Sequence, residues 1–326
     1  MKSVFAAVSG TTWARSAIRD VLTAVGRAGL WLVLPALGLA CAGGLPSTNL
    51  GGQEQASEGR IAFDVEWEGT IDVYIMNPDG SNQQQLTHVP GKQNEFPSLS
   101  PDRKQIVFLS NRTRNEDSDD LYVMNVDGSN VQRLTETGQI TNPDWSPDGR
   151  QILFEVRSGG QSAICIMNAD GSNVRRLTYA ANQTQMTPHW SSDGRQIAFS
   201  AVRDRDQAHQ LYAMNADGSN IRKLAPLPGR QFHPVWSPDG TKVVFMSEHE
   251  GGRFQIYVMD VDGSNLTRLT NTGLNRRPYW SPDGKRIVFQ SERQNTEFND
   301  ILVMDANGSN VRRLTSERDN AHPSWR

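Results

Sequence analysis

Six times this chain repeats a motif whose second copy reads Tyr122-Val123-Met124-Asn125-Val126-Asp127-Gly128-Ser129-Asn130. The Asp-Gly-Ser-Asn halves begin at Asp79, Asp127, Asp170, Asp217, Asp262 and, with one substitution, Asn307. Successive copies are 48, 43, 47, 45 and 45 residues apart. A period of this length is typical of repeat architectures in which each period is one small sheet.

Each period carries four landmarks in the same order. Pro-x-Trp-Ser-Pro-Asp-Gly comes first, as at residues 143–149, and a short apolar stretch such as Ile152-Leu153-Phe154 follows it. The Tyr-x-Met-Asn run is third, and Arg-Leu-Thr is last, as at Arg133-Leu134-Thr135. These runs are rich in β-formers and bounded by turn residues, so each period predicts four short strands. Asp-Gly predicts tight hairpins between them, because Gly accepts a positive φ without a steric penalty.

The two ends of the repeated region complete each other. The region opens at Arg60 on the second strand of a repeat, and it closes at His322-Pro323-Ser324-Trp325-Arg326, which is a first strand. Pairing of the two fragments would complete a sixth repeat and remove the open sheet edge between the ends. We therefore expect residues 60–326 to form an all-β fold: a six-bladed β-propeller of four-stranded antiparallel blades, closed by the C-terminal strand.

The repeats resemble a known family. Pro-x-Trp-Ser-Pro-Asp-Gly and Tyr-x-Met-Asn-x-Asp-Gly-Ser-Asn are similar to the WD-like repeats of the propeller domain of TolB, a periplasmic protein of the Tol–Pal system. The resemblance covers residues 60–326 and implies a propeller that binds a protein partner. TolB carries an α/β domain ahead of its propeller, and no such domain fits between residues 42 and 59 here, so the resemblance extends to the propeller alone.

The first 59 residues differ in composition from the repeats. Residues 28–40 are uncharged and apolar, and Arg15, Arg19 and Arg27 precede them. This is the layout of a secretory signal. Cys41 follows Gly38-Leu39-Ala40, close to a bacterial lipobox. We expect residues 1–41 to be a signal peptide or lipoprotein leader, and residues 42–59, rich in Gly, Ser and Gln, to be a flexible linker.

Cys41 has three interpretations. It is a lipid-modified N-terminus, a residue removed with the signal peptide, or part of an uncleaved anchor. All three interpretations predict a propeller outside the cytoplasmic membrane. The protein is then either periplasmic or a membrane-anchored lipoprotein, and in the second case only the N-terminal lipid anchor contacts the membrane. The other cysteine, Cys165, stands in the slot that Tyr holds in other repeats and is predicted to be a core residue.

Charge and motifs exclude several functions. The formal net charge of −3 argues against a nucleic-acid binder. No Gly-x-Ser-x-Gly elbow, catalytic Ser/His/Asp set or cofactor motif stands out, and His189, His233 and His322 do not form a plausible metal triad. We predict no catalytic residue, no metal and no cofactor, and a monomeric propeller.

Comparison of the six copies separates scaffold from site. Slots filled alike across the blades, such as the Met of Tyr-x-Met and the Trp of Pro-x-Trp, which Leu99 replaces in one copy, are predicted to be core. Asp260–Asn265 resembles the start of a calcium loop, but its recurrence in all blades indicates an Asx turn. The two tight turns of each blade share one face, which we name the tight-turn face. The second-to-third loops and the crossovers share the other, the variable face, where we expect function to reside.

The most informative variable slots lie at the start of each innermost strand, beside the central channel. We predict that they form a ring of binding residues around the channel mouth, suited to a peptide segment, a carboxylate or a sugar. The alternative is that they are ordinary solvated loop ends. The predicted binding residues are Asn94, Phe96, Asn142, Gln185, Gln231, His233, Asn275, Arg277, Asn320 and His322.

Three functions from different classes remain open at this point. The first is an extracytoplasmic binding platform that recognises a protein or peptide partner of the cell envelope. The second is a carbohydrate-active enzyme, because some lyases acting on oligogalacturonate are propellers with similar repeats and a histidine-held metal. The third is a structural envelope protein. We favour the binding platform.

Overall fold

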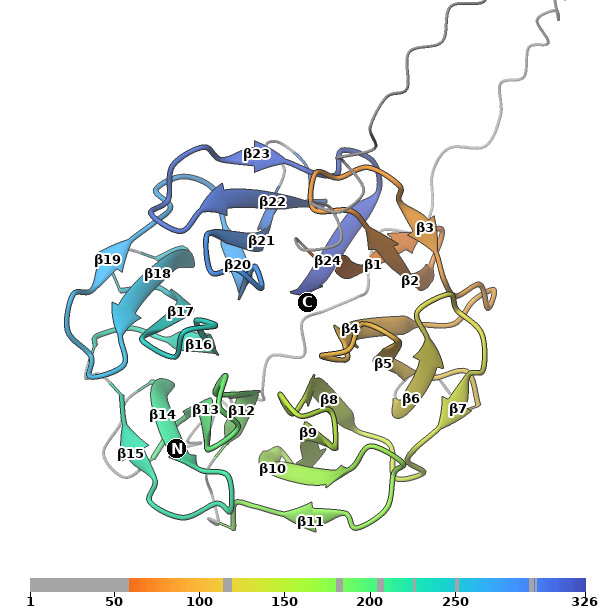
Figure 1. Cartoon of the computed structure of the whole chain (residues 1–326), viewed down its shortest axis with the longest axis horizontal. Helices are drawn as coiled ribbons and strands as arrows, with labels where there is room; N and C mark the ends of the chain where they lie inside the picture. Colours follow the sequence, from red (N-terminus) through yellow and green to blue (C-terminus); the bar gives the residue numbers. More distant parts are fainter. Residues whose placement is uncertain are drawn as a thin grey trace, which may run out of the picture. The chain divides into compact units, whose positions relative to one another are not determined.

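Six antiparallel sheets stand around a central axis (Figure 1). In the part of the chain that the structure describes, each sheet has four strands in meander order, and blade 1 has the order β24-β1-β2-β3. Blades 2 to 6 follow as β4–β7, β8–β11, β12–β15, β16–β19 and β20–β23. The predicted six-bladed β-propeller is confirmed.

The computed structural model describes residues 59–113, 119–179, 184–203, 208–224, 227–249, 252–292, 296 and 298–326. All of them belong to one compact unit, Gly51–Arg326. The predicted leader with Cys41 and the linker up to residue 58 lie outside the described residues, as does most of the variable loops at 111–117, 203–206 and 293–297. Within the described ranges, no helix is long and apolar enough to cross a membrane.

Each blade places its strands in the same order from the axis to the rim (Figure 1). The innermost strands are β24 (Asp319–Trp325), β4 (Asn94–Leu99), β8 (Ile140–Trp145), β12 (Gln185–Trp190), β16 (Gln231–Trp236) and β20 (Asn275–Trp280). The second strands are β1 (Ile61–Trp67), β5 (Gln105–Ser110), β9 (Gln151–Ser158), β13 (Gln196–Ala201), β17 (Lys242–Ser247) and β21 (Arg286–Glu292).

The two outer positions complete each blade. The third strands are β2 (Thr70–Met76), β6 (Asp120–Asn125), β10 (Gln161–Asn168), β14 (Gln210–Asn215), β18 (Gln255–Asp260) and β22 (Asn299–Asp305). The outermost strands are β3 (Gln84–Gln85), β7 (Gln132–Arg133), β11 (Arg175–Arg176), β15 (Arg222–Lys223), β19 (Thr267–Arg268) and β23 (Arg312–Arg313).

The ring closes as the sequence predicts. β24 pairs antiparallel with β1, with Ile61 opposite Trp325. The Arg60 N–H donates to the Arg326 carbonyl at 2.7 Å, and the Arg326 N–H donates to the Arg60 carbonyl at 3.1 Å. Residues from the two ends of the repeated region therefore share one sheet, and blade 1 is complete.

The apolar core lies between the blades. In β5, Ile106 and Phe108 pack in a cluster with blade 1, while Val107 and Leu109 pack in a cluster with blade 3. Both faces of such a strand are buried because a neighbouring blade covers each face, so the strand is apolar at successive positions. The Trp and Met slots are core as predicted, and Cys165 is buried and free of a disulfide.

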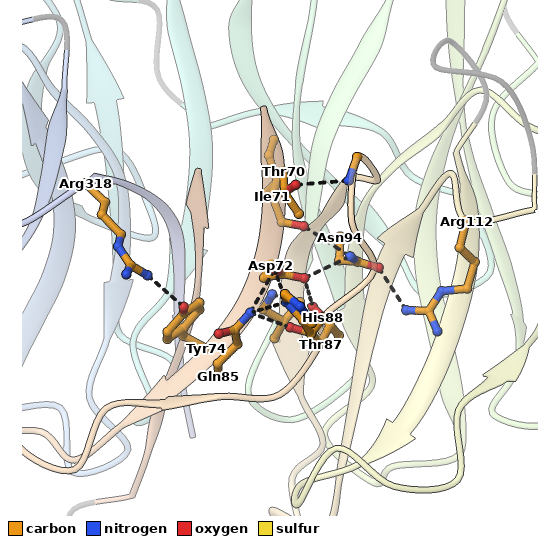
Figure 2. Close-up of polar contacts among 12 residues, drawn as sticks. Thr70, Ile71, Asp72, Tyr74, Gln85, Thr87, His88, Asn94, Arg112 and Arg318 are labelled. Atoms are coloured by element: carbon orange, nitrogen blue, oxygen red, sulfur yellow. Dashed lines mark hydrogen bonds and ion pairs between the residues drawn. The ribbon is translucent and has the colours of Figure 1, made fainter. Parts of the chain in front are cut away.

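In five of the six blades a threonine hydroxyl joins the rim to the third strand; blade 4 has Ala225 in this slot of the sequence. In blade 1, Thr87 Oγ1 donates to Asp72 Oδ1 at 2.7 Å and accepts the Val73 N–H at 2.9 Å (Figure 2). In blade 5, Thr270 Oγ1 donates to Gln255 Oε1 at 2.7 Å and accepts the Ile256 N–H at 2.9 Å. The Thr of the repeated Leu-Thr pair thus satisfies a backbone donor that the two-residue outer strand leaves unpaired.

The polar residues before this Leu-Thr pair support the same contact. Arg133 donates to Asp120 Oδ2 at 2.6 Å, and Gln85 donates to Asp72 Oδ2 at 2.9 Å. Arg268 Nε donates instead to the Thr270 carbonyl at 2.8 Å. Arg133 and Gln85 thus tie the outer strand to the third strand of their blades, whereas Arg268 bonds a carbonyl just beyond its own strand.

The glycine of Asp-Gly-Ser-Asn has a role beyond its turn. The turn itself is an Asx turn, as in blade 5, where the Ser264 N–H donates to Asp262 Oδ1 at 2.9 Å. Gly128 has a φ of 85°, and a Cβ there would lie 2.7 Å from the carbonyl oxygen of Leu86 in blade 1. Only Gly allows this approach, so the repeated turn also sets the spacing between neighbouring blades.

Substitution of Thr270 by Val tests the rim contact. Loss of the hydroxyl leaves the Ile256 N–H unsatisfied and removes one of the two hydrogen bonds to Gln255 Oε1, which keeps the bond from Asn275 Nδ2. We therefore expect a loss of about 1–3 kcal/mol in the free energy of unfolding, measured by urea titration. Exposed Thr267 on the same outer strand is the control, and Thr267→Val should stay within about 0.5 kcal/mol of wild type. Equal effects of the two substitutions would contradict the proposed role of the hydroxyl.

Gly128→Ala and Gly69→Ala separate turn strain from blade spacing. Both glycines have positive φ, but a Cβ at Gly69 meets nothing within 4 Å. Gly69→Ala should therefore cost only the backbone strain, about 1 kcal/mol, while Gly128→Ala should cost at least about twice that by forcing blades 1 and 2 apart. Thermal unfolding of the two variants side by side measures the difference, and similar losses would refute the blade-spacing role.

Candidate functional site

A cavity of about 50 Å³ lies where the innermost strands meet. All six blades contribute to its wall, since its lining residues come from β24, β4, β8, β12, β16 and β20. Figure 1 shows these strands around the centre of the ring. The cavity is therefore part of the central channel.

A β-bulge in every innermost strand aims side chains at the channel. In β4, Glu95 pairs with Leu109 but Ser98 pairs with Val107, so the inner strand has one extra residue. The residue before each Pro has a left-handed backbone with φ between 51° and 55°; these residues are Phe96, Asn142, Thr187, His233, Arg277 and His322. Such backbone costs about 1–3 kcal/mol for a residue other than Gly, so the surrounding structure must hold it in place.

Half of the predicted ring lines the cavity. Phe96, Asn142, His233, Arg277 and His322 are all lining residues. Thr187, the sixth residue before a Pro, does not line it, because its hydroxyl lies 2.9 Å from Ser200 Oγ and accepts the His233 N–H at 3.1 Å. The cavity wall therefore differs from blade to blade.

The predicted amide side chains two residues before the left-handed residue of their strands do not line the cavity. They are buried, and most of them donate to backbone carbonyls of the variable face; they are Asn94, Gln185, Gln231, Asn275 and Asn320. Asn94 Nδ2 donates to the Ile71 carbonyl at 3.1 Å (Figure 2), and Gln231 Nε2 donates to the Leu227 carbonyl at 2.8 Å. Asn275 and Asn320 bond the carbonyls of Thr272 and Glu317 in the same way. These contacts order the loops around the mouth.

Three side chains form a stack at the level of the bulges. The imidazole of His322 stacks on the Phe96 ring with centroids 3.7 Å apart and an interplanar angle of 23°. The Arg277 guanidinium lies 4.6 Å from the centroid of the Phe96 ring. His322 Nδ1 is 2.6 Å from Asp64 Oδ2, which fixes the orientation of the imidazole.

Two buried carboxylates on the second strands support the bulges, and the sequence reasoning missed both. Asp64 accepts the Phe96 N–H at 2.9 Å in addition to contacting His322. Glu155 accepts Asn142 Nδ2 at 2.9 Å and the Thr187 N–H at 3.3 Å. Each directly follows the Phe of a short apolar run in the sequence, Ile61–Phe63 or Ile152–Phe154. A charged residue directly after such a run was the feature of the sequence that could have identified both carboxylates.

A second layer of channel residues follows each Pro, and it too was missed. Asp144, His189 and Tyr279 belong to it, and the Arg326 guanidinium reaches Asp144 Oδ1 at 3.4 Å. Burial alone would raise the pKa of Asp144, but His189 and Arg326 outweigh burial and hold that pKa below its usual value. Burial raises the pKa of Tyr279, so its hydroxyl stays protonated.

Arg277 and His233 are the two titratable residues before a Pro whose pKa values burial lowers most. Burial lowers the pKa of the Arg277 guanidinium to about 10, because Asp64 and Glu95 offset only part of the desolvation. The pKa of His233 is lowered well below 6.5 by burial and by the nearby charges of Arg277, His189 and His322. At neutral pH, Arg277 is therefore a charged group beside a neutral His233.

Metal ligation finds no support in this geometry. Among the described residues, no group of three or more His, Cys, Asp or Glu side chains is placed to hold a metal ion. His189 and His233 have ring centroids 6.0 Å apart, and His322 is engaged with Asp64. The arrangement suits recognition of a polar group through Arg277 and neighbouring hydrogen-bonding side chains.

A larger groove of about 470 Å³ lies between blades 5 and 6 on the tight-turn face. Its wall includes Asp239, Trp280, Asp283 and Gly284, which are slots of the repeated motif. Residues that recur from blade to blade have the same structural role in each blade, so this groove is not specific to one site. The channel cavity, whose wall differs between blades, is the stronger candidate site.

The chain is thus a closed β-propeller with an asymmetric polar site in its channel. Residues 182–326 match the family of the TolB beta propeller domain, and residues 116–224 match that of the Tricorn protease N-terminal beta propeller domain. None of the curated proteins compared with the chain matches it. The chain carries a TolB-like β-propeller, as its repeats predict.

Solved structures of the same fold include TolB itself. TolB from Acinetobacter baumannii is 22% identical with a TM-score of 0.72, and the match covers 82% of this chain and 67% of that chain. A protein from Agrobacterium tumefaciens assigned as TolB is 25% identical with a TM-score of 0.64, covering 80% and 91%. Oligogalacturonate lyase from Vibrio parahaemolyticus is 14% identical with a TM-score of 0.51, covering 77% and 87%, a likeness of fold alone.

Replacement of His233 by Asn tests the electrostatics of the channel. A folded-state pKa below the unfolded value of about 6.5 means that the stability from neutral His233 is complete above pH 6.5 and is lost as the pH falls below it. Asn already holds this slot and backbone at Asn142. Between pH 7 and 5, His233→Asn should therefore lose about 2 kcal/mol less unfolding free energy than wild type.

Urea titrations at the two pH values measure this difference. His88 is the control, since its side chain is 76% exposed, and His88→Asn should keep the wild-type pH dependence. If His233→Asn and wild type lose the same free energy on acidification, His233 is not a neutral buried group.

Proposed function

We propose that this protein is an extracytoplasmic binding platform that recognises a protein or peptide partner of the cell envelope. The partner inserts a segment at the mouth of the channel, on the variable face. The TolB-like propeller supports a protein-interaction role in general. The proposals of a cell-envelope partner and of an extracytoplasmic location rest on the channel site and on the leader.

The observation that carries the proposal is the asymmetric cavity beneath the mouth. Sites that enclose a whole small molecule usually measure about 300–1,000 Å³. A cavity of about 50 Å³ instead accepts one functional group of a larger partner, whose remaining contacts lie outside it. This favours binding of a chain segment over processing of a sugar, and the lyase likeness supports fold alone.

The leader supports export. The basic approach, the apolar core and Cys41 in residues 1–41 match a secretory signal with a lipid-attachment site. We propose a periplasmic or lipid-anchored protein whose residues 42–59 tether a monomeric propeller. The formal net charge of −3 suits a protein partner better than a nucleic acid.

Capture from solubilised envelope extract tests the proposal. With the tagged full-length chain as bait, we expect the partner to be retained and identified by mass spectrometry. The double variant His233→Ala/Arg277→Ala should retain at least about tenfold less, because it removes a charge-assisted contact. Its melting temperature should stay within about 3 °C of wild type, since Arg277 makes no hydrogen bond or ion pair to the described residues whose loss would unfold the ring.

Lys285→Gln is the matched control, because Lys285 lies in a tight turn of blade 6 and its side chain is 82% exposed. It should retain the partner as wild type does. A large loss of stability in the double variant together with undiminished capture would refute the proposal.

A further inference from the structure

The side chain of Arg277 reaches past a neighbouring blade to an aromatic ring. It belongs to β20 in blade 6, and the Phe96 ring beneath its guanidinium belongs to β4 in blade 2. Blade 1 lies between these blades around the ring. The guanidinium therefore lies over the side of the channel that blades 1 and 2 form.

No carboxylate of the described residues pairs with this guanidinium. Asp64 is engaged by His322 and by the Phe96 N–H. In the layer below, Asp144 accepts the Trp190 N–H at 3.0 Å and faces Arg326 and His189. The N–H groups of half-buried Arg277 have no acceptor among the described residues, and the nearby charges of Asp64 and Glu95 offset only part of its desolvation.

Unpaired hydroxyls lie on the same side of the cavity. Ser98 Oγ in blade 2 and Ser324 Oγ in blade 1 have no hydrogen-bond partner among the described residues. These serines are 4% and 5% exposed, and both line the cavity with Arg277. Buried hydroxyls rarely stay unsatisfied, so they point to a ligand atom that accepts their protons.

Asn142 adds a hydrogen-bond acceptor to these donors. Its Nδ2 donates to Glu155, but its Oδ1, in a side chain that is 7% exposed, accepts no hydrogen bond from the described residues. The cavity thus offers donors from Arg277, Ser98 and Ser324 beside the acceptor of Asn142, and the ring nitrogens of His189 in its wall also have no hydrogen-bond partner among the described residues. A carboxylate with an amide N–H close by has the complementary pattern.

We propose that the channel cavity binds one carboxylate of the inserted partner segment, held by the Arg277 guanidinium and the hydroxyls of Ser98 and Ser324. The inference rests on the proposed function, which supplies the segment. The carboxylate belongs to an Asp, a Glu or a chain end, and its neighbouring N–H donates to Asn142 Oδ1. A planar guanidinium and a carboxylate fit by two parallel hydrogen bonds.

The size of the cavity selects the protein source over a free acid. About 50 Å³ holds a carboxylate and little else, so a free acid would gain few contacts beyond the group itself. A group of four heavy atoms binds weakly even in a good site. Tight and selective binding therefore needs the rest of a segment outside the cavity.

Acetate is the probe for the group itself. Titration of the full-length chain with sodium acetate, at constant ionic strength and followed by ¹H–¹⁵N NMR, should shift the amides of residues around the cavity, with a dissociation constant on the order of millimolar. Acetamide, which lacks the charge, should leave them unshifted. Arg277→Gln should weaken acetate binding at least about tenfold, while Lys285→Gln should bind as wild type.

Peptides test the source of the carboxylate. One pool of random octapeptides carries Asp, Glu and a free C-terminus, and a matched pool carries Asn, Gln and an amidated C-terminus. The acidic pool should be retained at least about tenfold better by the full-length chain, and Arg277→Gln should abolish the difference. Retention of both pools alike would overturn the inference while leaving a peptide-binding platform intact.

Other outcomes are equally decisive. Absence of acetate shifts, or equal binding to Arg277→Gln, would refute the carboxylate site whatever the envelope capture shows. Inorganic phosphate binding tighter than acetate would replace the carboxylate with a phosphate. A third outcome is acetate binding that depends on Arg277, while neither peptide pool and no envelope protein is retained. This outcome would refute the protein source of the carboxylate and the proposed function, but it would leave the carboxylate site itself intact.

Discussion

The pairing of β24 with β1 is the interaction on which the rest of the structure depends. It places Ile61 opposite Trp325 and joins residues from the two ends of the repeated region in one sheet. The largest apolar cluster includes both of these residues together with side chains of blades 5 and 6. It also builds the site, since His322 and Ser324 come from β24 while Asp64 comes from β1. A ring without this pairing would lack both a closed core and one side of the channel cavity.

The bulge in each innermost strand converts a repeated scaffold into a site. The extra residue and the same left-handed backbone recur in all six blades, and five of the six side chains before Pro line the cavity. The backbone N–H groups released by the bulges find acceptors in neighbouring blades, as Phe96 does in Asp64 and His233 in Thr187. The scaffold therefore repeats, while the side chains that it presents differ. Six-fold regularity in the backbone is compatible with one asymmetric cavity.

Burial of charge gives this channel its chemical character. Asp64, Asp144 and Glu155 are each matched by an imidazole, a guanidinium or backbone N–H groups. Arg277 alone among the charged residues lining the cavity has an aromatic ring in place of an opposite charge. Because uncompensated charge in a desolvated place is unfavourable, a binding partner that supplies a negative group gains from its neutralisation. In the binding that we propose, recognition through this channel is therefore electrostatic first and shape-selective second.

The sequence by itself determined the repeat number, the strand order, the ring closure and the core slots of Trp and Met. Those features follow from local periodicity, which acts the same way in every copy. It also indicated two slots at the start of each innermost strand as the ones beside the channel mouth. Tertiary structure decided which predicted side chains reach the cavity: Phe96, Asn142, His233, Arg277 and His322 line it, whereas the amides at Asn94 and Gln231 turn back to loop carbonyls. The roles of Asp64, Glu155 and Arg326 depend on contacts between blades far apart in sequence, so only the folded ring could show them.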